Sequence, residues 1–183
     1  RGVGRGAPGE RVDAAPGAAD LTMTATDPMP ATRSSLALGA PRFADTRLAR
    51  LAADQGAVAA WQAALTKGAS QAAAEVTGDF AVALCEPTGR TYLAVDRFAI
   101  QTLCYRVTDG QLRFAARADE LADAGTPIDP QAIFDYLYFH VIPSPRTIYQ
   151  GIYRLPPGHY ALFEDGRITV APYWTPGFTE PPA

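Results

Sequence analysis

The stretch of sequence that decides the fold is FAVALCEPTGRTYLAV, residues 80–95. Its two apolar runs, Phe80–Leu84 and Thr91–Val95, have the length and the β-branched and aromatic content typical of buried strands. Pro87-Thr88-Gly89 lies between them and supplies residues that favour a turn. We therefore expect a β-hairpin at the centre of the chain.

A second hairpin is expected directly after the first. Leu103–Val107 and Gln111–Ala115 flank Asp109-Gly110, and Asp-Gly between two apolar runs is a strong short-range hairpin signal. The alternation of apolar positions predicts that the four strands of residues 80–115 are adjacent and antiparallel.

The C-terminal part of the sequence predicts one more hairpin. Tyr160–Phe163 and Ile168–Ala171 flank the turn residues Glu164-Asp165-Gly166. Antiparallel hairpins together with separate helical segments indicate an α+β fold.

Helical spacing occurs on both sides of the central strands. One pattern begins at Thr46, ends at Gln55-Gly56, and is followed by a second pattern that Gly68 closes. We expect these two helices to pack on a sheet face. Two short segments, Gln71–Glu75 and Ala118–Ala124, are also expected to be helical. A further helix is expected to begin at Pro130, with Asp129 as its cap, and to reach about His140, because Pro143 and Pro145 stop it.

Both ends of the sequence are rich in Gly and Pro. Residues 1–35 are too punctuated for long helices or central strands, and only Leu21–Thr26 could form a short strand. We divide the chain into a flexible start or remnant strands (1–35), one domain (36–174), and a linker to an absent further domain (175–183).

Composition narrows the class of protein. A chain of 183 residues supports one hydrophobic core, and a net charge of −3 argues against a general polyanion binder, so no nucleic-acid partner is expected. Apolar runs are all much shorter than the roughly 18 residues of a membrane span. Two cysteines are too few for a disulfide framework. These features predict a cytoplasmic protein without membrane contact.

Few residues offer obvious chemistry. Cys85, Cys104, His140 and His159 lack the spacing of a zinc site, so no metal is expected, and both cysteines adjoin apolar strands where buried thiols act as small hydrophobes. A nucleophilic Cys85 would need a nearby base and an electropositive setting.

Three other features have structural readings. The Gly-rich start lacks the context of a phosphate-binding loop, so no nucleotide cofactor is expected from it. The Tyr-rich stretch of residues 136–160 is expected to serve core and interface packing. Asp96-Arg97 follows a strand, and we expect the carboxylate and the guanidinium to form a bridge that fixes the turn, with a ligand clamp as the alternative.

The order of motifs along the chain resembles a known family. The strings GDFAVAL (78–84), VDRF (95–98), LCY (103–105), LRFA (112–115) and RLPPGH (154–159) resemble the glutaminase half of asparagine synthetase-like proteins. Those are class II glutamine amidotransferases with the N-terminal nucleophile hydrolase fold. The resemblance covers roughly Leu36 to Trp174 and implies an α-β-β-α sandwich of antiparallel sheets. The motif residues taken as structural are Gly78, Asp79, Asp96, Arg97, Pro157 and Gly158.

The sequence departs from the family pattern at the positions that carry catalysis. The family's nucleophile is an N-terminal cysteine whose own amine acts as the base, and here the first residue is Arg1. Where the family has Asn-Gly-Glu-Ile-Tyr-Asn, with an oxyanion donor, this sequence has GAPRFA from Gly39 to Ala44.

Three more positions of the family's site also differ. The family's Asp for the glutamine amine falls at about Gly56, and its Arg for the carboxylate falls near Thr24 or Ala25. The family's Asp-Arg-Phe-Gly-Ile-Arg-Pro is DRFAIQT here, residues 96–102, which loses the glycine. The synthetase half's ATP loop is absent, so no ATP cofactor is expected.

These departures leave three hypotheses. The first is a degenerate glutaminase-type domain without catalytic or substrate-binding residues, which supports a synthetase domain or an equivalent subunit. The second is an active glutamine-hydrolysing amidotransferase domain whose N-terminal cysteine is missing from this chain. The third is a small-molecule binding module that uses the remnant cleft. Exposed sheet edges and the Tyr-rich stretch also predict a homodimer.

Overall fold

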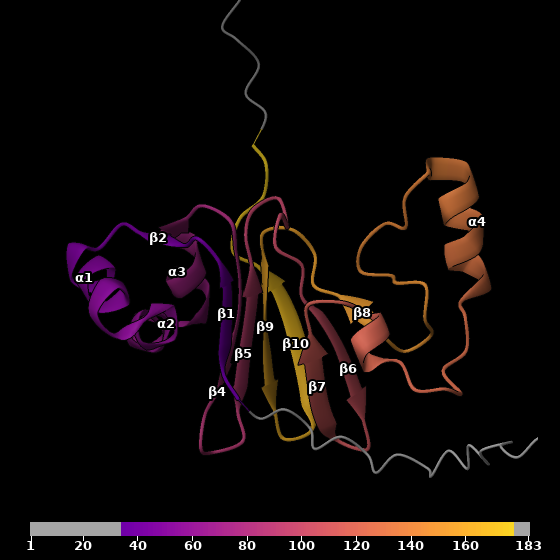
Figure 1. Cartoon of the computed structure of the whole chain (residues 1–183), viewed down its shortest axis with the longest axis horizontal. Coiled ribbons are helices and arrows are strands. Elements are labelled where there is room, and N and C mark those ends of the chain that lie inside the picture. The colour runs from indigo at the N-terminus through magenta and orange to yellow at the C-terminus, as the bar shows by residue number, and fades with distance from the viewer. Residues whose placement is uncertain (1–33, 178–183) are drawn as a thin grey trace, which may run out of the picture. The chain divides into compact units, whose positions relative to one another are not determined.

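The computed structural model describes residues 34–177 (Figure 1). The helices are α1 (Thr46–Gln55), α2 (Ala57–Leu65), α3 (Ala69–Ala74) and α4 (Pro130–Phe139), with a 3₁₀ helix at Asp119–Leu121. The strands are β1 (Leu36–Gly39), β2 (Arg42–Phe43), β3 (Val76–Thr77), β4 (Phe80–Cys85), β5 (Thr91–Val95), β6 (Cys104–Thr108), β7 (Gln111–Ala115), β8 (Tyr153–Arg154), β9 (His159–Glu164) and β10 (Arg167–Pro172).

The strands form a five-stranded sheet with the order β1-β4-β5-β9-β10 and a three-stranded sheet with the order β7-β6-β8. All neighbouring pairs in both sheets are antiparallel. Strands β2 and β3 form a separate short pair. The structure thus confirms the mixed fold of helices and antiparallel sheets.

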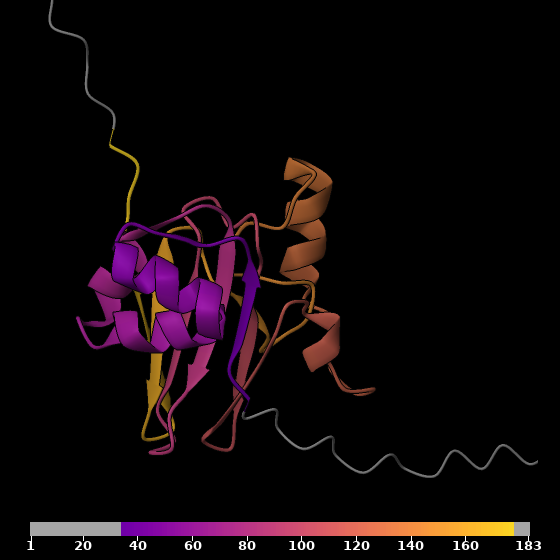
Figure 2. The ribbon, with the colours of Figure 1, turned by 60° about the vertical axis from the view of Figure 1, so that its left-hand side comes forward.

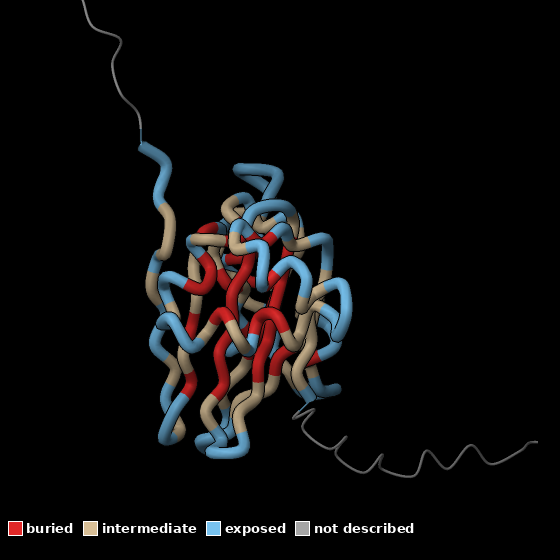
Figure 3. The backbone as a smooth tube through the Cα atoms, turned by 90° about the vertical axis from the view of Figure 1, so that its left-hand side faces the viewer, coloured by how far each residue is buried: buried red, intermediate tan, exposed pale blue. Residues whose placement is uncertain are grey.

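Alternating side chains of β4 and β5 supply two separate cores. On one face, Phe80, Val82 and Leu84 of β4 pack with Trp61 of α2 and with further residues of α1–α3. On the other face, Ala81 and Ala83 pack with residues of the three-stranded sheet and its flanking loops, among them Leu103, Tyr105, Phe114 and Leu155. The five-stranded sheet therefore lies between a helical layer and the second sheet, as Figure 2 shows from another side. Buried residues gather in its central strands (Figure 3).

The predicted hairpins form with the expected turns. Asp109 and Gly110 have φ of 51° and 69°, and Asp165 and Gly166 have φ of 51° and 75°. Positive φ at both central residues is the geometry that matches the twist of the paired strands, and Asp-Gly adopts it readily. The predicted packing of the Thr46 and Gly56 helices on a sheet face is confirmed as well.

Three sequence predictions need correction. The four strands of residues 80–115 are not all neighbours, because β5 pairs with β9 while β6 and β7 belong to the other sheet. The residues between β5 and β6 turn about Asp96 and carry the chain across to that sheet. The helix expected at Ala118–Ala124 is only the 3₁₀ turn Asp119–Leu121. The aromatic residues of α4 are exposed, so the expectation that they pack in a core is wrong, while the expectation of an interface stays a prediction. Leu21–Thr26 lies outside the described residues.

Candidate functional site

The turn after β5 is organised by one buried carboxylate. Asp96 is 1% exposed and accepts hydrogen bonds from the backbone N–H groups of Phe80 at 3.2 Å, Phe98 at 2.9 Å, Ile100 at 3.1 Å and Gln101 at 3.0 Å. A buried carboxylate is stable only when its oxygens are bonded in this way. Asp96 therefore fixes residues 97–101 against the first residue of β4.

Arg97 does not form the expected bridge with Asp96. The ion pairs among the described residues do not include this pair. Instead, the Arg97 guanidinium lies 5.9 Å from the centroid of the Trp174 ring and its Nη2 is 3.5 Å from the Ala74 carbonyl oxygen. The prediction that Asp96 fixes the turn is correct, but its partners are backbone N–H groups, because the carboxylate points inward while Arg97 stays half-exposed.

Gly78 and Asp79 meet the end of β1 at close range. The Ala40 N–H donates to the Asp79 carbonyl at 2.9 Å. Gly39 has φ of 81°, and a Cβ there would lie 2.4 Å from the same carbonyl oxygen. Gly78 has φ of 87°, and a Cβ there would lie 2.5 Å from the Ala40 carbonyl oxygen. The two segments thus cross where each has a glycine.

The Asp79 side chain links this crossing to the Asp96 turn. Gln101 Nε2 donates to Asp79 Oδ2 at 2.9 Å. This hydrogen bond is the main reason that the pKa of Asp79 lies below its ordinary value. Sequence reasoning missed this contact, although Gln101 stands where the resembling family has an Arg.

Pro157 and Gly158 close the cluster from the start of β9. The Gly158 N–H donates to the Asp96 carbonyl at 3.0 Å, and the Gly158 carbonyl accepts from the N–H groups of Tyr173 and Trp174. A Cβ on Gly158 would lie 2.7 Å from the Trp174 carbonyl oxygen. The Pro157 carbonyl oxygen is 2.8 Å from Nδ1 of His159. The structure therefore brings all six motif residues to one end of the five-stranded sheet.

The two cysteines lie away from this cluster. Cys85 ends β4 while Phe80 begins it, and a six-residue strand spans roughly 17 Å. His159 begins β9, and the pairing of Phe163 with Thr91 and of Tyr160 with Ala94 places it at the Asp96 end of the sheet. His159 therefore lies at the opposite end of the sheet from Cys85.

Cys104 is a buried thiol. It is 3% exposed, and burial raises its pKa to about 11. A thiol of that pKa is almost entirely protonated at neutral pH, and the thiolate is the nucleophilic form. Among residues 34–177, no cluster of His, Cys, Asp and Glu could hold a metal ion.

The cavities found among the described residues lie outside the motif cluster, and two of them are described here. One of about 360 Å³ is lined by Cys85, Glu86, Gln111 and Phe163 among others, between hairpin ends. The other, of about 490 Å³, lies beside α4 and is lined by Asp129, Asp135, Arg146 and Tyr153 among others. None of the six motif residues lines either cavity, so the cavities and the Asp96 turn are separate features of the fold.

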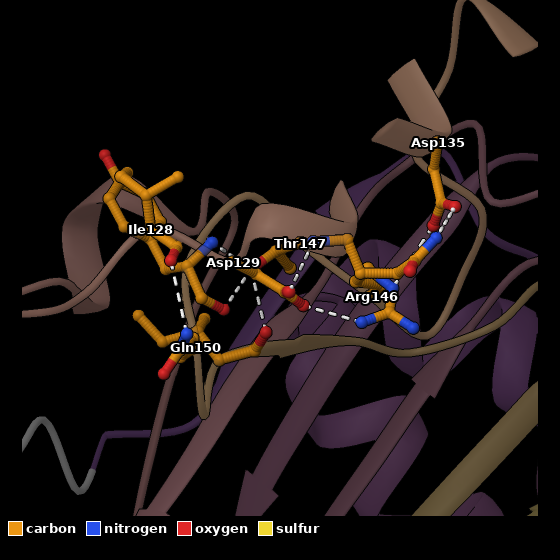
Figure 4. Close-up of polar contacts among 9 residues, drawn as sticks. Ile128, Asp129, Asp135, Arg146, Thr147 and Gln150 are labelled. Carbon is orange, nitrogen blue, oxygen red and sulfur yellow. Dashed lines mark hydrogen bonds and ion pairs between the residues drawn. The ribbon is translucent and has the colours of Figure 1, made fainter. Parts of the chain in front are cut away.

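The α4 segment is held by an arginine between two carboxylates. Arg146 Nη1 donates to Asp129 Oδ2 at 2.6 Å, and Arg146 Nε lies 3.3 Å from Asp135 Oδ2 (Figure 4). Asp129 also caps α4, because its Oδ1 accepts from the Gln131 N–H. The Arg146 hydrogen bond is the first cause of a lowered Asp129 pKa. The sequence indicated the cap but gave no sign of the arginine seventeen residues later.

Comparison with known proteins identifies the domain. A family model described as "Glutamine amidotransferase domain" matches residues 54–174. The chain belongs to the glutamine amidotransferase domain family. All six motif residues lie inside the matched range, whereas Gly39 lies before it.

One curated relative of this amidotransferase domain is a larger enzyme. The chain is 30% identical over 112 residues to "Asparagine synthetase [glutamine-hydrolyzing] 1" of Bacillus subtilis (strain 168). The match covers 59% of this chain and 18% of that relative. The domain is therefore an asparagine synthetase-like glutamine amidotransferase domain that spans less than a fifth of the relative. Within the described part of the amidotransferase domain, no helix is long and apolar enough to cross a membrane.

Proposed function

We propose that this is a degenerate glutaminase-type domain that supports a synthetase domain and does not itself hydrolyse glutamine. Its fold is then the α-β-β-α sandwich of the N-terminal nucleophile hydrolases, with domain limits at 36–174 and a linker at 175–183. We also propose a cytoplasmic location, on the composition argument given above.

One observation carries this proposal. Gly39 stands where the resembling family has the asparagine of its oxyanion hole, and its φ of 81° and the short Cβ distance to Asp79 leave no room for a side chain. An oxyanion donor must be fixed in position before the reaction begins, and loss of one donor typically costs about 100- to 1000-fold in rate. The local backbone is built around the glycine.

The remaining polar groups of the cluster support the same reading. All four N–H groups that Asp96 binds, and the amide of Gln101, are used to hold the turn together. Gly56, where the family has its amine-binding Asp, joins α1 to α2 with φ of 90° and has no side chain to offer. Groups committed to internal bonds in this way are suited to stability and not to binding glutamine.

The proposed role in supporting a synthetase domain rests on the partial match to the curated relative. More than four-fifths of the asparagine synthetase lies outside its match to this chain. We propose that the partner of this domain is a synthetase domain of its parent protein, or an equivalent subunit, that makes an amide.

The alternative is an active amidotransferase domain with a cysteine supplied ahead of Arg1. The relative, whose name states that it hydrolyses glutamine, favours it. Asp96 also keeps the four hydrogen bonds that hold its turn. In this alternative the chain delivers ammonia to the synthetase domain once its N-terminal cysteine is present.

Glutamate release from glutamine tests the proposal. We expect none from the purified chain, and none from Gly39→Asn, because the new side chain cannot adopt the geometry of an oxyanion donor. Release that Cys85→Ala or Cys104→Ala abolishes would overturn the proposal by showing a different active site. Release from the same domain expressed with a processed N-terminal Cys, at a rate far above the chain with an N-terminal Ser, would establish the alternative.

A further inference from the structure

The cavity beside α4 gathers charged groups of both signs. Its volume is about 490 Å³, which lies within the range of roughly 300–1,000 Å³ that small-molecule sites have. Its charged lining residues are Asp129, Asp135 and Arg146, which we call the Arg146 clamp. Two carboxylates and one guanidinium leave this cavity with one net negative charge. The function proposed above uses none of these residues.

The guanidinium of Arg146 is only partly engaged. Its Nη1 donates to Asp129, and its Nε faces Asp135 (Figure 4). Within residues 34–177, no acceptor is bonded to Nη2. The side chain is 41% exposed, so a ligand in the cavity can reach it. Guanidinium groups favour carboxylates as partners, and Nη2 is therefore a donor suited to the carboxylate of a ligand.

The two carboxylates of the clamp can also accept more hydrogen bonds. Asp129 accepts from the Gln131 N–H and from Arg146, and Asp135 accepts from Gln131 Nε2 and lies beside Arg146. A carboxylate offers about four lone-pair positions. The side chains of Asp129 and Asp135 are 18% and 14% exposed, and one guanidinium balances only one of them. A partly buried surplus charge of this kind is stabilised by an ammonium group.

The walls of the cavity are apolar and aromatic. They are formed by Pro143, Pro145, Tyr149, Ile152 and Tyr153 among others. The Thr147 hydroxyl donates to the Ile152 carbonyl at 2.7 Å and accepts from the Tyr149 N–H at 3.2 Å, so this wall is held in place from within. A wall that is fixed before binding loses little conformational entropy when a ligand packs on it. An apolar side chain of a ligand therefore suits these walls.

We propose that the cavity beside α4 binds an apolar α-amino acid, with its carboxylate on Arg146 Nη2, its ammonium on Asp135, and its side chain against the prolines and tyrosines. A zwitterion uses both kinds of charge. A simple amine would leave Nη2 without an acceptor, and a simple carboxylate would meet the net negative charge of the cavity. None of the six motif residues lines this cavity, so the proposal stands or fails independently of the function proposed above.

The test is a titration of the ¹⁵N-labelled full chain with L-leucine, followed by NMR. We expect saturable binding at one site with a dissociation constant of about 1 mM or tighter. Two analogues each lack one charged group: isoamylamine lacks the carboxylate, and 4-methylpentanoate lacks the amine. Each should bind at least about tenfold more weakly, because each loses a charge-assisted hydrogen bond. The amides of Arg146 and Gly151 should shift with leucine, while those of α1 should not.

Asp135→Asn tests the ammonium contact. It keeps the size of the side chain but removes one negative charge from the cavity. Leucine should then bind at least about tenfold more weakly, whereas 4-methylpentanoate should bind as tightly as before or more tightly. A role of Asp135 in holding α4 alone would weaken both ligands alike. The control is Asp54→Asn, which removes the same charge from the exposed surface of α1 and should change neither constant.

Several outcomes would overturn the proposal. One is no saturable binding of leucine up to about 20 mM, and another is leucine binding no tighter than either analogue. Shifts centred away from the cavity, or leucine binding that Asp135→Asn leaves unchanged, would also contradict it, as would equal weakening of leucine and 4-methylpentanoate. If Asp135→Asn does not fold, the two analogues and the positions of the shifts in the unchanged chain still decide the question.

Discussion

Aspartate carboxylates organise both the Asp96 turn and the α4 segment, but the two regions differ in which side chains they leave exposed. At the turn, a carboxylate lies inside and binds backbone N–H groups, so the loop is closed on the sheet. At α4, carboxylates bind Arg146 beneath the helix, and the apolar side chains remain outside. The first arrangement completes a surface within the domain. The second leaves an apolar surface exposed.

The Asp96 turn contributes to the stability of the domain, whereas the α4 segment contributes an exposed surface. The turn joins β4, β5 and the start of β9, so losing it affects the core of both sheets. The α4 segment is tied mainly to its own flanking loop, and it stands clear of the sheets in Figures 1 and 2. We therefore expect global effects from changes at the turn and local effects from changes at α4.

The largest effect is expected from Asp96→Ala. The substitution leaves four N–H groups without their acceptor in a buried site, and at about 1 kcal/mol or more for each group the chain should lose about 4 kcal/mol of unfolding free energy. The measurement is a urea titration followed by circular dichroism. Asp54→Ala, at an exposed carboxylate of α1, is the control and should change stability by less than about 0.5 kcal/mol. Similar urea midpoints for Asp96→Ala and Asp54→Ala would contradict a global effect of the Asp96 turn on stability.

The sequence predicted local structure well where short-range rules act alone. Asp109-Gly110 specifies its turn because both residues tolerate positive φ, and Asp129-Pro130 specifies a helix start because a carboxylate and a fixed φ suit the first turn. The family resemblance predicted the amidotransferase domain, which the match over residues 54–174 confirms.

Long-range pairing was beyond those rules. Nothing in the spacing of β5 and β6 shows that β9, more than sixty residues after β5, takes the place beside it. Charge complementarity suggested Arg97 as the partner of Asp96, but burial made backbone N–H groups the partners. The signals around residues 130–139 likewise predicted a helix without showing whether the core or the solvent receives its apolar side chains.

An effect of middle size is expected from Arg146→Met at the other region. Loss of the guanidinium frees Asp129 and Asp135 from their shared partner, so α4 should open more often while the sheets stay folded. Amide hydrogen exchange should be roughly tenfold faster in α4 and unchanged in β4 and β5. Arg117→Met is the control, because the Arg117–Asp119 pair is a well-exposed surface contact. Exchange that accelerates equally in the sheets would mean that α4 is part of the main cooperative unit.

The same clamp predicts a dependence on pH. The pKa of Asp129 is held below its ordinary value chiefly by the hydrogen bond from Arg146. A lowered pKa in the folded state contributes stability above the ordinary value, and that contribution is lost as the pH falls through the folded value. Protection of the α4 amides, taken relative to the intrinsic exchange rate at each pH, should therefore fall below about pH 4 in the unchanged protein. In Arg146→Met that loss of protection should be smaller.

The smallest effect, and one of opposite sign, is expected from Ala99→Gly in the Asp96 turn. Ala99 has φ of 50° where the resembling family has glycine, so it bears a left-handed conformation that costs an alanine about 1–2 kcal/mol relative to glycine. Glycine gains more freedom in the unfolded chain, which offsets about 0.4–1 kcal/mol, and Ala99 loses a methyl group that packs on the second core. The net expectation is a gain of about 0.5 kcal/mol in the unfolding free energy. Ala122→Gly is the matched control, since Ala122 is also half-buried but has φ of −81°, and it should lose a similar amount. If urea titrations show both variants destabilised alike, Ala99 is not strained in the turn. The hydrogen bonds of Asp96 would then not be holding the turn against a strained backbone.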